Sequence, residues 1–363
     1  MQQPYFLNAG GNVNTPMKNG IYLKFADSNA IIKSISTPSE QYVIIESIYK
    51  GKNTKIELNA GMTETGVVID ADPNTYVRII SDDPLLLPAI RELSIGGTLS
   101  EFLVIGRGDE VKLPVVLNVS ECANLSRFCI EYKDSAETIQ QFYAQGCTSL
   151  SSLTLNSATS LYVCDLSGCA SLSDLDLRDS PLRNLNISNC VSLEISKLTL
   201  NTNSALTSLD ISGTMFHEDI LDVIAGYGKI TVLNMHSMPN VINVDITKLV
   251  TLLQLDAHNC ANLNAIEIPM SVTTCNIAGC SKLRQLRSQA RKLVELDLSG
   301  DIWLNMIDVF DTANENVSNS IAIAIQSALS RGTFNYSDES TTQTYLSIVE
   351  NACYENDWTV THS

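Results

Sequence analysis

Short alternations of apolar and polar residues recur between residues 93 and 301 of the chain. Most copies read apolar, polar, apolar, then two small or polar residues and a terminal Cys, Thr, Met or Asp. The ten copies are LSIGGT at 93–98, LNVSEC at 117–122, FYAQGC at 142–147, CDLSGC at 164–169, LNISNC at 185–190, LDISGT at 209–214, LNMHSM at 233–238, LDAHNC at 255–260, CNIAGC at 275–280 and LDLSGD at 296–301. Because side chains alternate between the two faces of a strand, each copy predicts a short strand with its apolar residues facing inward.

Several intervals between the copies contain a second apolar-polar-apolar triplet. These triplets are Leu153 to Leu155, Leu175 to Leu177, Leu198 to Leu200, Val244 to Ile246 and Ile266 to Ile268. A coil of about 22 residues cannot bury its own apolar side, so neighbouring coils have to stack. The pattern therefore predicts a mostly β chain with a solenoid of about ten coils at its centre.

The spacing L-x-L-x-x-C/N, with a repeat length in the low twenties, resembles the leucine-rich repeat. With Cys at the terminal position, the copies are similar to the cysteine-ladder repeats of bacterial internalin-type proteins and of Bacteroidetes surface proteins. Thr98, Thr214, Met238 and Asp301 depart from that pattern, so the expected ladder is interrupted there. The resemblance covers residues 93 to 301 and implies a leucine-rich-repeat-like solenoid.

The segments outside the repeats follow other patterns. Before residue 91, six short apolar segments separated by turn-forming residues predict a β-sandwich-like domain. The six segments begin at Gly20, Ala30, Tyr42, Thr54, Thr65 and Thr75. Met215 to Lys229 has apolar residues at helical spacing and predicts a helix in place of a second strand.

After residue 301 the repeat motif stops, and a helix around Ser320 to Leu329 leads to an apolar segment near the end. This segment predicts a C-terminal α/β cap, which a solenoid needs to stay soluble. We therefore expect an N-terminal β domain at 1–90 for anchoring or assembly, the solenoid at 91–301 and the cap at 302–363.

All ten cysteines lie at or after Cys122. In the terminal position of a repeat, Cys acts as a small, nearly apolar side chain whose thiol donates weakly to a neighbouring carbonyl. Structural zinc sites use Cys pairs two to four residues apart, whereas these intervals are about 20 residues, so we expect inert thiols and no metal site. Stacked coils bring successive thiols within roughly 4.8 Å, which leaves disulfides or metal capture as the alternative.

The polar residue between the two apolar strand positions is the main candidate for partner binding. We call these residues the outer column: Asn118, Tyr143, Asp165, Asn186, Asp210, Asn234, Asp256, Asn276 and Asp297. Stacking aligns them along one sheet face, where their amides and carboxylates suit a sugar, a peptide or a basic partner. The alternative is that Asn and Asp are only tolerated at exposed repeat positions. His236 and His258 share a register two residues later and are expected to lie side by side, either solvated or in contact with a partner.

Charge and missing motifs narrow the function. The chain has 23 Lys and Arg against 40 Asp and Glu, a net charge of −17, which disfavours nucleic acid and anionic membrane surfaces. An apolar run of about 18 residues is absent, so we expect no membrane insertion. Phosphate-binding loops, nucleophile elbows and a Ser/His/Asp order are also absent, so we expect neither an enzyme nor a cofactor.

The sequence hypothesis is a non-enzymatic protein that binds a protein or a cell-surface glycan on its repeat sheet. The N-terminus shows no basic region followed by an apolar one, so no secretion signal is expected. A β anchoring domain followed by binding repeats would then suit a bacteriophage virion component, such as a tail or receptor-binding protein, in contact with other virion proteins. The alternative is a cytoplasmic bacterial scaffold or effector that binds a protein partner.

Overall fold

A computed structural model describes residues 20–37, 43–50, 52–59, 61–73, 75–81, 90–105, 114–130, 139–155, 158–202, 205–227, 229–309, 314–336 and 345–362. The chain divides into two units. Unit 1 comprises 1–181 with 197–201, and unit 2 comprises 182–196 with 202–363. The boundaries expected at residues 90 and 301 come from changes in sequence pattern rather than from a division into compact units, and they stay predictions.

Unit 1 starts with antiparallel strands built around one long strand, β1 (Gly20–Ser36). The first half of β1 pairs with β5 and its second half with β4, while β6 pairs along both halves. β2 lies between β5 and β3. The bounds of these partners are β2 (Val43–Tyr49), β3 (Lys52–Leu58), β4 (Thr63–Ile69), β5 (Tyr76–Ser81) and β6 (Glu92–Ile105).

The two strands predicted at Gly20 and Ala30 are therefore one strand, which is a correction. Register shifts between Lys24 and Ala30 let β1 continue through the polar residues that the pattern treats as a break. The four later segments each form a strand as predicted. A β-sandwich-like arrangement stays a prediction.

The repeats of unit 1 form two parallel ladders. In the first, β6, β7 (Val116–Asn118), β9 (Gln141–Tyr143) and β11 (Val163–Asp165) pair in the expected register, because Leu93, Leu117, Phe142 and Cys164 lie opposite one another in turn. The second ladder consists of β10 (Ser152–Thr154), β12 (Asp174–Leu177) and β14 (Leu198–Leu200). A strand not predicted, β8 (Arg127–Ile130), pairs with the second half of β6, and the 3-10 helix η2 (Ile195–Lys197) leads into β14.

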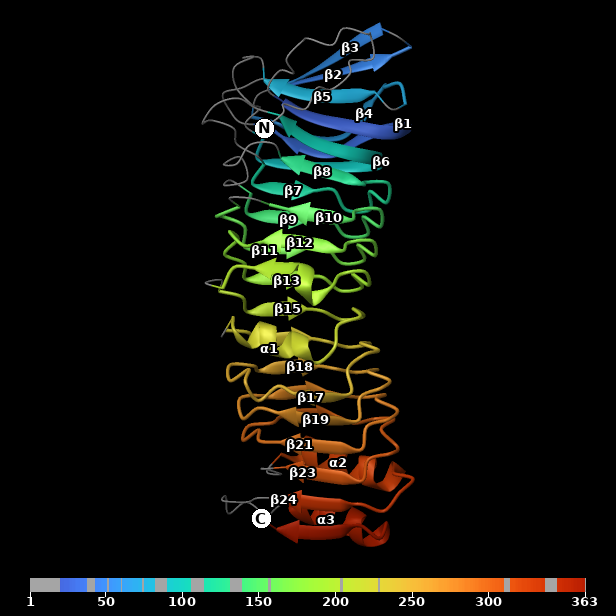
Figure 1. The fold of residues 1–363 in the computed structure, drawn as a ribbon, viewed down its shortest axis with the longest axis vertical. Helices are drawn as coiled ribbons and strands as arrows, with labels where there is room; N and C mark the ends of the chain where they lie inside the picture. The colour runs from blue at the N-terminus through green and yellow to red at the C-terminus, as the bar shows by residue number, and fades with distance from the viewer. Residues whose placement is uncertain are drawn as a thin grey trace. The chain divides into compact units, whose positions relative to one another are not determined.

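Unit 2 also contains two parallel sheets, drawn from yellow-green to red in Figure 1. Its first sheet consists of β13 (Asn184–Asn186), β15 (Ser208–Asp210), β16 (Val232–Asn234), β18 (Gln254–Asp256), β20 (Thr274–Asn276) and β22 (Glu295–Asp297). Its second sheet consists of β17 (Asn243–Asp245), β19 (Ala265–Ile268), β21 (Gln285–Ser288), β23 (Met306–Val309), β24 (Thr333–Tyr336) and β25 (Thr359–His362). The first sheet keeps the predicted register from Leu185 to Leu296.

The parallel ladder continues beyond the last motif copy. β23, β24 and β25 extend the second sheet past residue 301, where copies of the six-residue motif no longer occur. Two helices, α2 (Glu315–Ser327) and α3 (Leu346–Glu355), follow β23 and β24. The helix predicted within Met215 to Lys229 is α1 (Asp219–Ala225), and Ile220, Leu221 and Ile224 form its buried face.

The residue before each ladder position has a left-handed backbone conformation. In nine of the ten copies φ at this residue lies between 57° and 75°, and it is 83° at Gly300. These residues are Gly97, Glu121, Gly146, Gly168, Asn189, Gly213, Ser237, Asn259, Gly279 and Gly300. Gly and Asn adopt this conformation most readily, which explains the small or polar residue at the fifth position of the motif.

Glu218, directly before α1, accepts hydrogen bonds at the start of β17, an edge strand of the second sheet. At other strand starts in this sheet, two consecutive N–H groups share one carbonyl of the preceding coil, as Asn264 and Ala265 do at the Ile242 carbonyl. The N–H groups of Ile242 and Asn243 instead both donate to Glu218 Oε1, each at 3.0 Å. Partial burial alone would raise the pKa of Glu218, but these N–H donors outweigh it and lower the pKa below its usual value.

Replacing Glu218 with Ala is expected to lower the free energy of unfolding by about 1–3 kcal/mol, since two edge N–H groups lose a charged acceptor. Glu218→Gln keeps an oxygen acceptor and should lose less. Because the folded pKa is depressed, this contribution is present above the unfolded pKa of about 4.3 and is lost as the pH falls through the folded pKa. Urea denaturation at neutral and acidic pH measures both effects; equal stabilities of the Ala variant and the parent would contradict the edge-capping role.

Candidate functional site

The outer column lies on the outward face of the first ladder in each unit. In unit 2, register pairing places Asn186, Asp210, Asn234, Asp256, Asn276 and Asp297 opposite one another in succession. In unit 1, Tyr143 lies between Asn118 and Asp165. The structure therefore brings together, within each unit, the candidates that the sequence predicts.

Most members of the outer column also hold the turn that follows their strand. In the repeated contact, the side-chain Oδ1 accepts the backbone N–H two residues later, at 2.8–3.2 Å. It recurs at Asn118, Asp165, Asn186, Asp210, Asp256, Asn276 and Asp297. This is an Asx-turn, in which Asn and Asp serve equally because each supplies the same oxygen. Sequence reasoning missed this role, although the predominance of Asn and Asp in the column, with Tyr143 as the exception, signals it.

In the first sheet of unit 2, Asp and Asn alternate from strand to strand, so the carboxylates of Asp210, Asp256 and Asp297 lie on every second strand. Like charges opposite each other on neighbouring strands destabilise a sheet, and this alternation doubles their separation. Asn234 lies on the strand between Asp210 and Asp256, and its Nδ2 donates to Asp210 Oδ2 at 3.3 Å. Neither Lys nor Arg occurs in the outer column or at the outward positions two residues before and after it, so the face is acidic.

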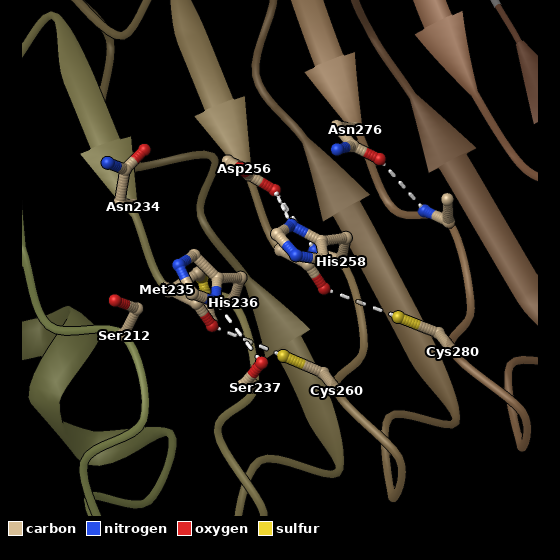
Figure 2. A network of polar contacts seen from close by, with 12 residues as sticks. Ser212, Asn234, Met235, His236, Ser237, Asp256, His258, Cys260, Asn276 and Cys280 are labelled. Carbon is tan, nitrogen blue, oxygen red and sulfur yellow. Dashed lines mark hydrogen bonds and ion pairs between the residues drawn. The ribbon is translucent and has the colours of Figure 1, made fainter. Parts of the chain in front are cut away.

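The two histidines stack on this face, as Figure 2 shows. Their ring centroids lie 4.4 Å apart with planes inclined by 21°. His258 Nδ1 lies 2.6 Å from Asp256 Oδ1, and His236 Nδ1 lies 3.1 Å from Ser237 Oγ. A metal ion binds in the plane of an imidazole ring, so stacked rings direct their lone pairs along parallel planes and do not converge on one ion. Throughout the described part of the chain, no three His, Cys, Asp or Glu residues are grouped as a metal site.

The ladder thiols face the interior and donate to backbone carbonyls of the preceding coil. Cys147, Cys169, Cys260 and Cys280 do so at 3.0–3.3 Å, and Cys122 at 3.7 Å. Two of these bonds are drawn in Figure 2. Burial raises the pKa of the Cys122 and Cys169 thiols to about 11, and a protonated, buried thiol is unreactive.

We expect the ladder cysteines of unit 1, Cys122, Cys147 and Cys169, to resist alkylation in the folded protein, because burial raises the pKa of each thiol. Iodoacetamide at mildly alkaline pH should first modify Cys129, which is half-buried, whereas Cys147 and Cys169 should react only as fast as the chain unfolds. Mass spectrometry of timed peptide digests, with and without denaturant, follows each thiol separately. Rapid labelling of Cys147 or Cys169 in the native protein would contradict this account.

A shallow hollow lies on the second sheet of unit 2, away from the predicted candidates. Residues of β17, β19 and β21 line it, among them Asn243, Ala265, Glu267 and Arg287. Ala265 provides its floor because Asn243 and Gln285, on either side in register, have longer side chains. The sequence pattern identifies two of these three strands, β17 and β19, but the alternation of apolar and polar residues does not predict where the sheet surface is hollowed.

The search of protein families, the search of curated proteins and the search of solved structures each find no match for this chain. In the described residues, none of the helices has the length and apolar character needed to cross a membrane.

Proposed function

We propose that this chain is a non-enzymatic binding protein with leucine-rich-repeat-like coils. The first sheet of unit 2 binds a partner through its outward polar face. The observation that carries the proposal is the register of Asp210, Asp256 and Asp297 on a face without Lys or Arg. Because regularly spaced carboxylates complement positive charge, the partner presents basic groups, on a protein or on a cell-surface glycan.

The Asx-turn supports this assignment by fixing where the charges lie. One carboxylate oxygen of each Asp is held by a backbone N–H, so the side chain cannot rotate freely and loses little entropy on binding. The spacing along the sheet is two strands, roughly 9 to 10 Å between successive carboxylates. A partner with basic groups at a matching spacing can engage several carboxylates at once.

The test is a binding assay of purified protein on whole bacteria and on a glycan array, comparing the parent with the triple variant Asp210→Asn, Asp256→Asn, Asp297→Asn. Asn forms the same turn at Asn186 and Asn276, so the variant should fold while losing three charges. We expect binding to fall by about tenfold or more, since each rim charge contributes up to about 1 kcal/mol.

The matched control removes three charges from the second sheet, with Asp245→Asn, Glu267→Gln and Asp308→Asn. This control should bind like the parent. Equal losses in both variants would assign the effect to net charge rather than to this face, and a parent that binds nothing would contradict the binding role.

We keep a virion component as the proposed setting, with a cytoplasmic scaffold as the alternative. Both settings involve the same face of unit 2. Association of the tagged protein with purified virion proteins would support the virion setting, and its absence would favour the cytoplasmic scaffold.

A further inference from the structure

Tyr143 is the one member of the outer column that is neither Asn nor Asp, so its side chain cannot supply the Asx-turn oxygen. The Asx-turn oxygen recurs on both sides of it in unit 1, at Asn118 and Asp165. In the coil of Tyr143, the corresponding N–H of Gln145 donates instead to Ser120 Oγ at 3.3 Å. A large, half-buried aromatic side chain therefore occupies a position that Asn or Asp would fill with a better turn.

Tyr143 belongs to a cluster of polar side chains on β9, on β11 and directly beside these strands. The Tyr143 hydroxyl donates to Gln141 Oε1 at 3.0 Å, and Gln141 Nε2 donates to the Tyr162 hydroxyl at 2.8 Å. Beside them, Gln145 Nε2 donates to Asp165 Oδ2 at 2.6 Å. These five residues come from two adjacent strands and the turns that flank them.

The hydrogen bonds fix the orientation of each polar group before any ligand arrives. The Tyr162 hydroxyl accepts a hydrogen bond from Gln141, and among the described residues its own proton has no acceptor. Gln145 donates through Nε2 to Asp165, while its Oε1 accepts no hydrogen bond from the described part of the chain. The cluster thus offers an oriented donor and an oriented acceptor next to two phenol rings.

This composition matches the surface of a neutral sugar. A pyranose has an apolar face of C–H groups that packs on an aromatic ring, and a rim of hydroxyl groups that donate and accept hydrogen bonds. The cluster contains one carboxylate and neither Lys nor Arg, so an anionic sugar would meet repulsion with no compensating cation. Tyrosine also provides rigid contact area at low entropic cost.

We propose that Tyr143, Tyr162, Gln141, Gln145 and Asp165 form a binding site for neutral saccharides on the outward sheet of unit 1. This site lies outside the acidic face of unit 2 that carries the proposed function, so either assignment can fail without the other.

The experiment titrates the full chain with neutral hexasaccharides of glucose, of galactose and of N-acetylglucosamine, and with an oligouronate as the anionic probe. Saturation-transfer NMR detects weak binding and calorimetry measures its strength. The key variant is Tyr143→Asn, which installs the residue that the preceding coil uses for its turn, at Asn118, and should therefore fold. The control is Tyr354→Ala, which removes a tyrosine that is 88% exposed on α3.

We expect at least one neutral oligosaccharide to bind the parent and the Tyr354→Ala variant equally, and its affinity for Tyr143→Asn to fall by about tenfold. Thermal unfolding of the Tyr143→Asn variant should match or exceed that of the parent. The proposal would be overturned if no neutral oligosaccharide binds at millimolar concentration, if Tyr143→Asn binds as well as the parent, or if the oligouronate binds more tightly than the neutral probes.

Discussion

Replacing Asp301 with Asn is expected to stabilise the protein at neutral pH. Asp301 occupies the ladder position that Cys fills in most coils, and only 2% of its surface is exposed. Its Oδ1 accepts the Cys280 N–H at 2.8 Å, whereas the buried Oδ2 has no hydrogen-bond partner within the described chain. Burial raises the pKa of this carboxyl to about 8; the Cys280 N–H opposes the shift and the charge of Asp297 adds to it.

The direction of this stability change follows from the pKa of Asp301 in the folded and in the unfolded chain. In the unfolded chain Asp ionises near pH 3.9, whereas folded Asp301 stays protonated until about pH 8. Between these values folding requires the uptake of a proton, so stability falls by up to about 1.4 kcal/mol per pH unit as the pH rises. Asn does not ionise, and its Nδ2 group can donate to a carbonyl as the ladder thiols of Cys260 and Cys280 do.

Urea denaturation of the parent and of Asp301→Asn from pH 4 to pH 8 measures the difference directly. We expect the two stabilities to approach each other near pH 4 and Asn to be favoured by about 2–4 kcal/mol at pH 7. Asp297→Asn serves as the control: it is an exposed site and the variant keeps Asp301, so its stability should fall with rising pH nearly as steeply as that of the parent, reduced only by loss of the Asp297 charge that adds to the Asp301 shift. A parent that is as stable as Asp301→Asn at every pH would show that Asp301 is ionised in the folded state.

Gly279→Ala is expected to destabilise the protein by about 2 kcal/mol or more. Gly279 has a φ of +73°, and a Cβ at this position would lie 2.4 Å from Asn259 Oδ1 in the preceding coil. The left-handed conformation costs roughly 1–2 kcal/mol for a residue with a side chain, and displacing Asn259 adds to this cost. Gly213 and Asn189 repeat the same arrangement.

A double-mutant cycle separates the two costs. Asn259→Gly removes the obstructing side chain, so Gly279→Ala should cost less in that background and retain mainly the backbone strain. Thermal and urea unfolding of the four proteins provide the coupling energy. Additive effects of the two substitutions would mean that the Asn259 side chain does not press against residue 279.

The sequence predicts the parts of the fold that repeat. The alternation around Leu209, Leu233 and Leu255 identifies the strands, and the fixed spacing to the ladder residue sets their register, because a slip of one residue would turn every leucine to the solvent. The terminal Cys is also interpretable, since only an inward position accommodates so many small apolar side chains.

Features that interrupt the repeat are harder to predict. Glu218 accepts the N–H groups of Ile242 and Asn243, which lie 24 and 25 residues later in the chain. No local sequence pattern predicts a contact over that distance. β24 and β25 join the second sheet without the motif, because the intervening helices rather than a short turn return the chain to it. The ladder position of Asp301 is visible in the sequence, but its burial and missing partner are not.

The candidate site, too, can be predicted from the sequence only in part. The sequence predicts that Asp210 and Asp256 share one face, but it does not distinguish a binding column from a column that serves the turns. The structure shows that the turns use one side-chain oxygen at most positions of the column, Asp210 and Asp256 among them. The fold therefore explains why Asn or Asp stands there, but it does not explain the charge. The proposed function therefore rests on the negative charge that distinguishes Asp from Asn in this column.

The most direct test of this account measures how strongly the parent and the Asp210→Asn, Asp256→Asn, Asp297→Asn variant bind whole bacteria as the salt concentration rises. We predict that the parent binds at low salt and weakens steadily as salt screens its carboxylates, while the variant binds weakly and depends little on salt. A variant that binds as tightly as the parent, with the same salt dependence, would contradict the assignment of binding to this face.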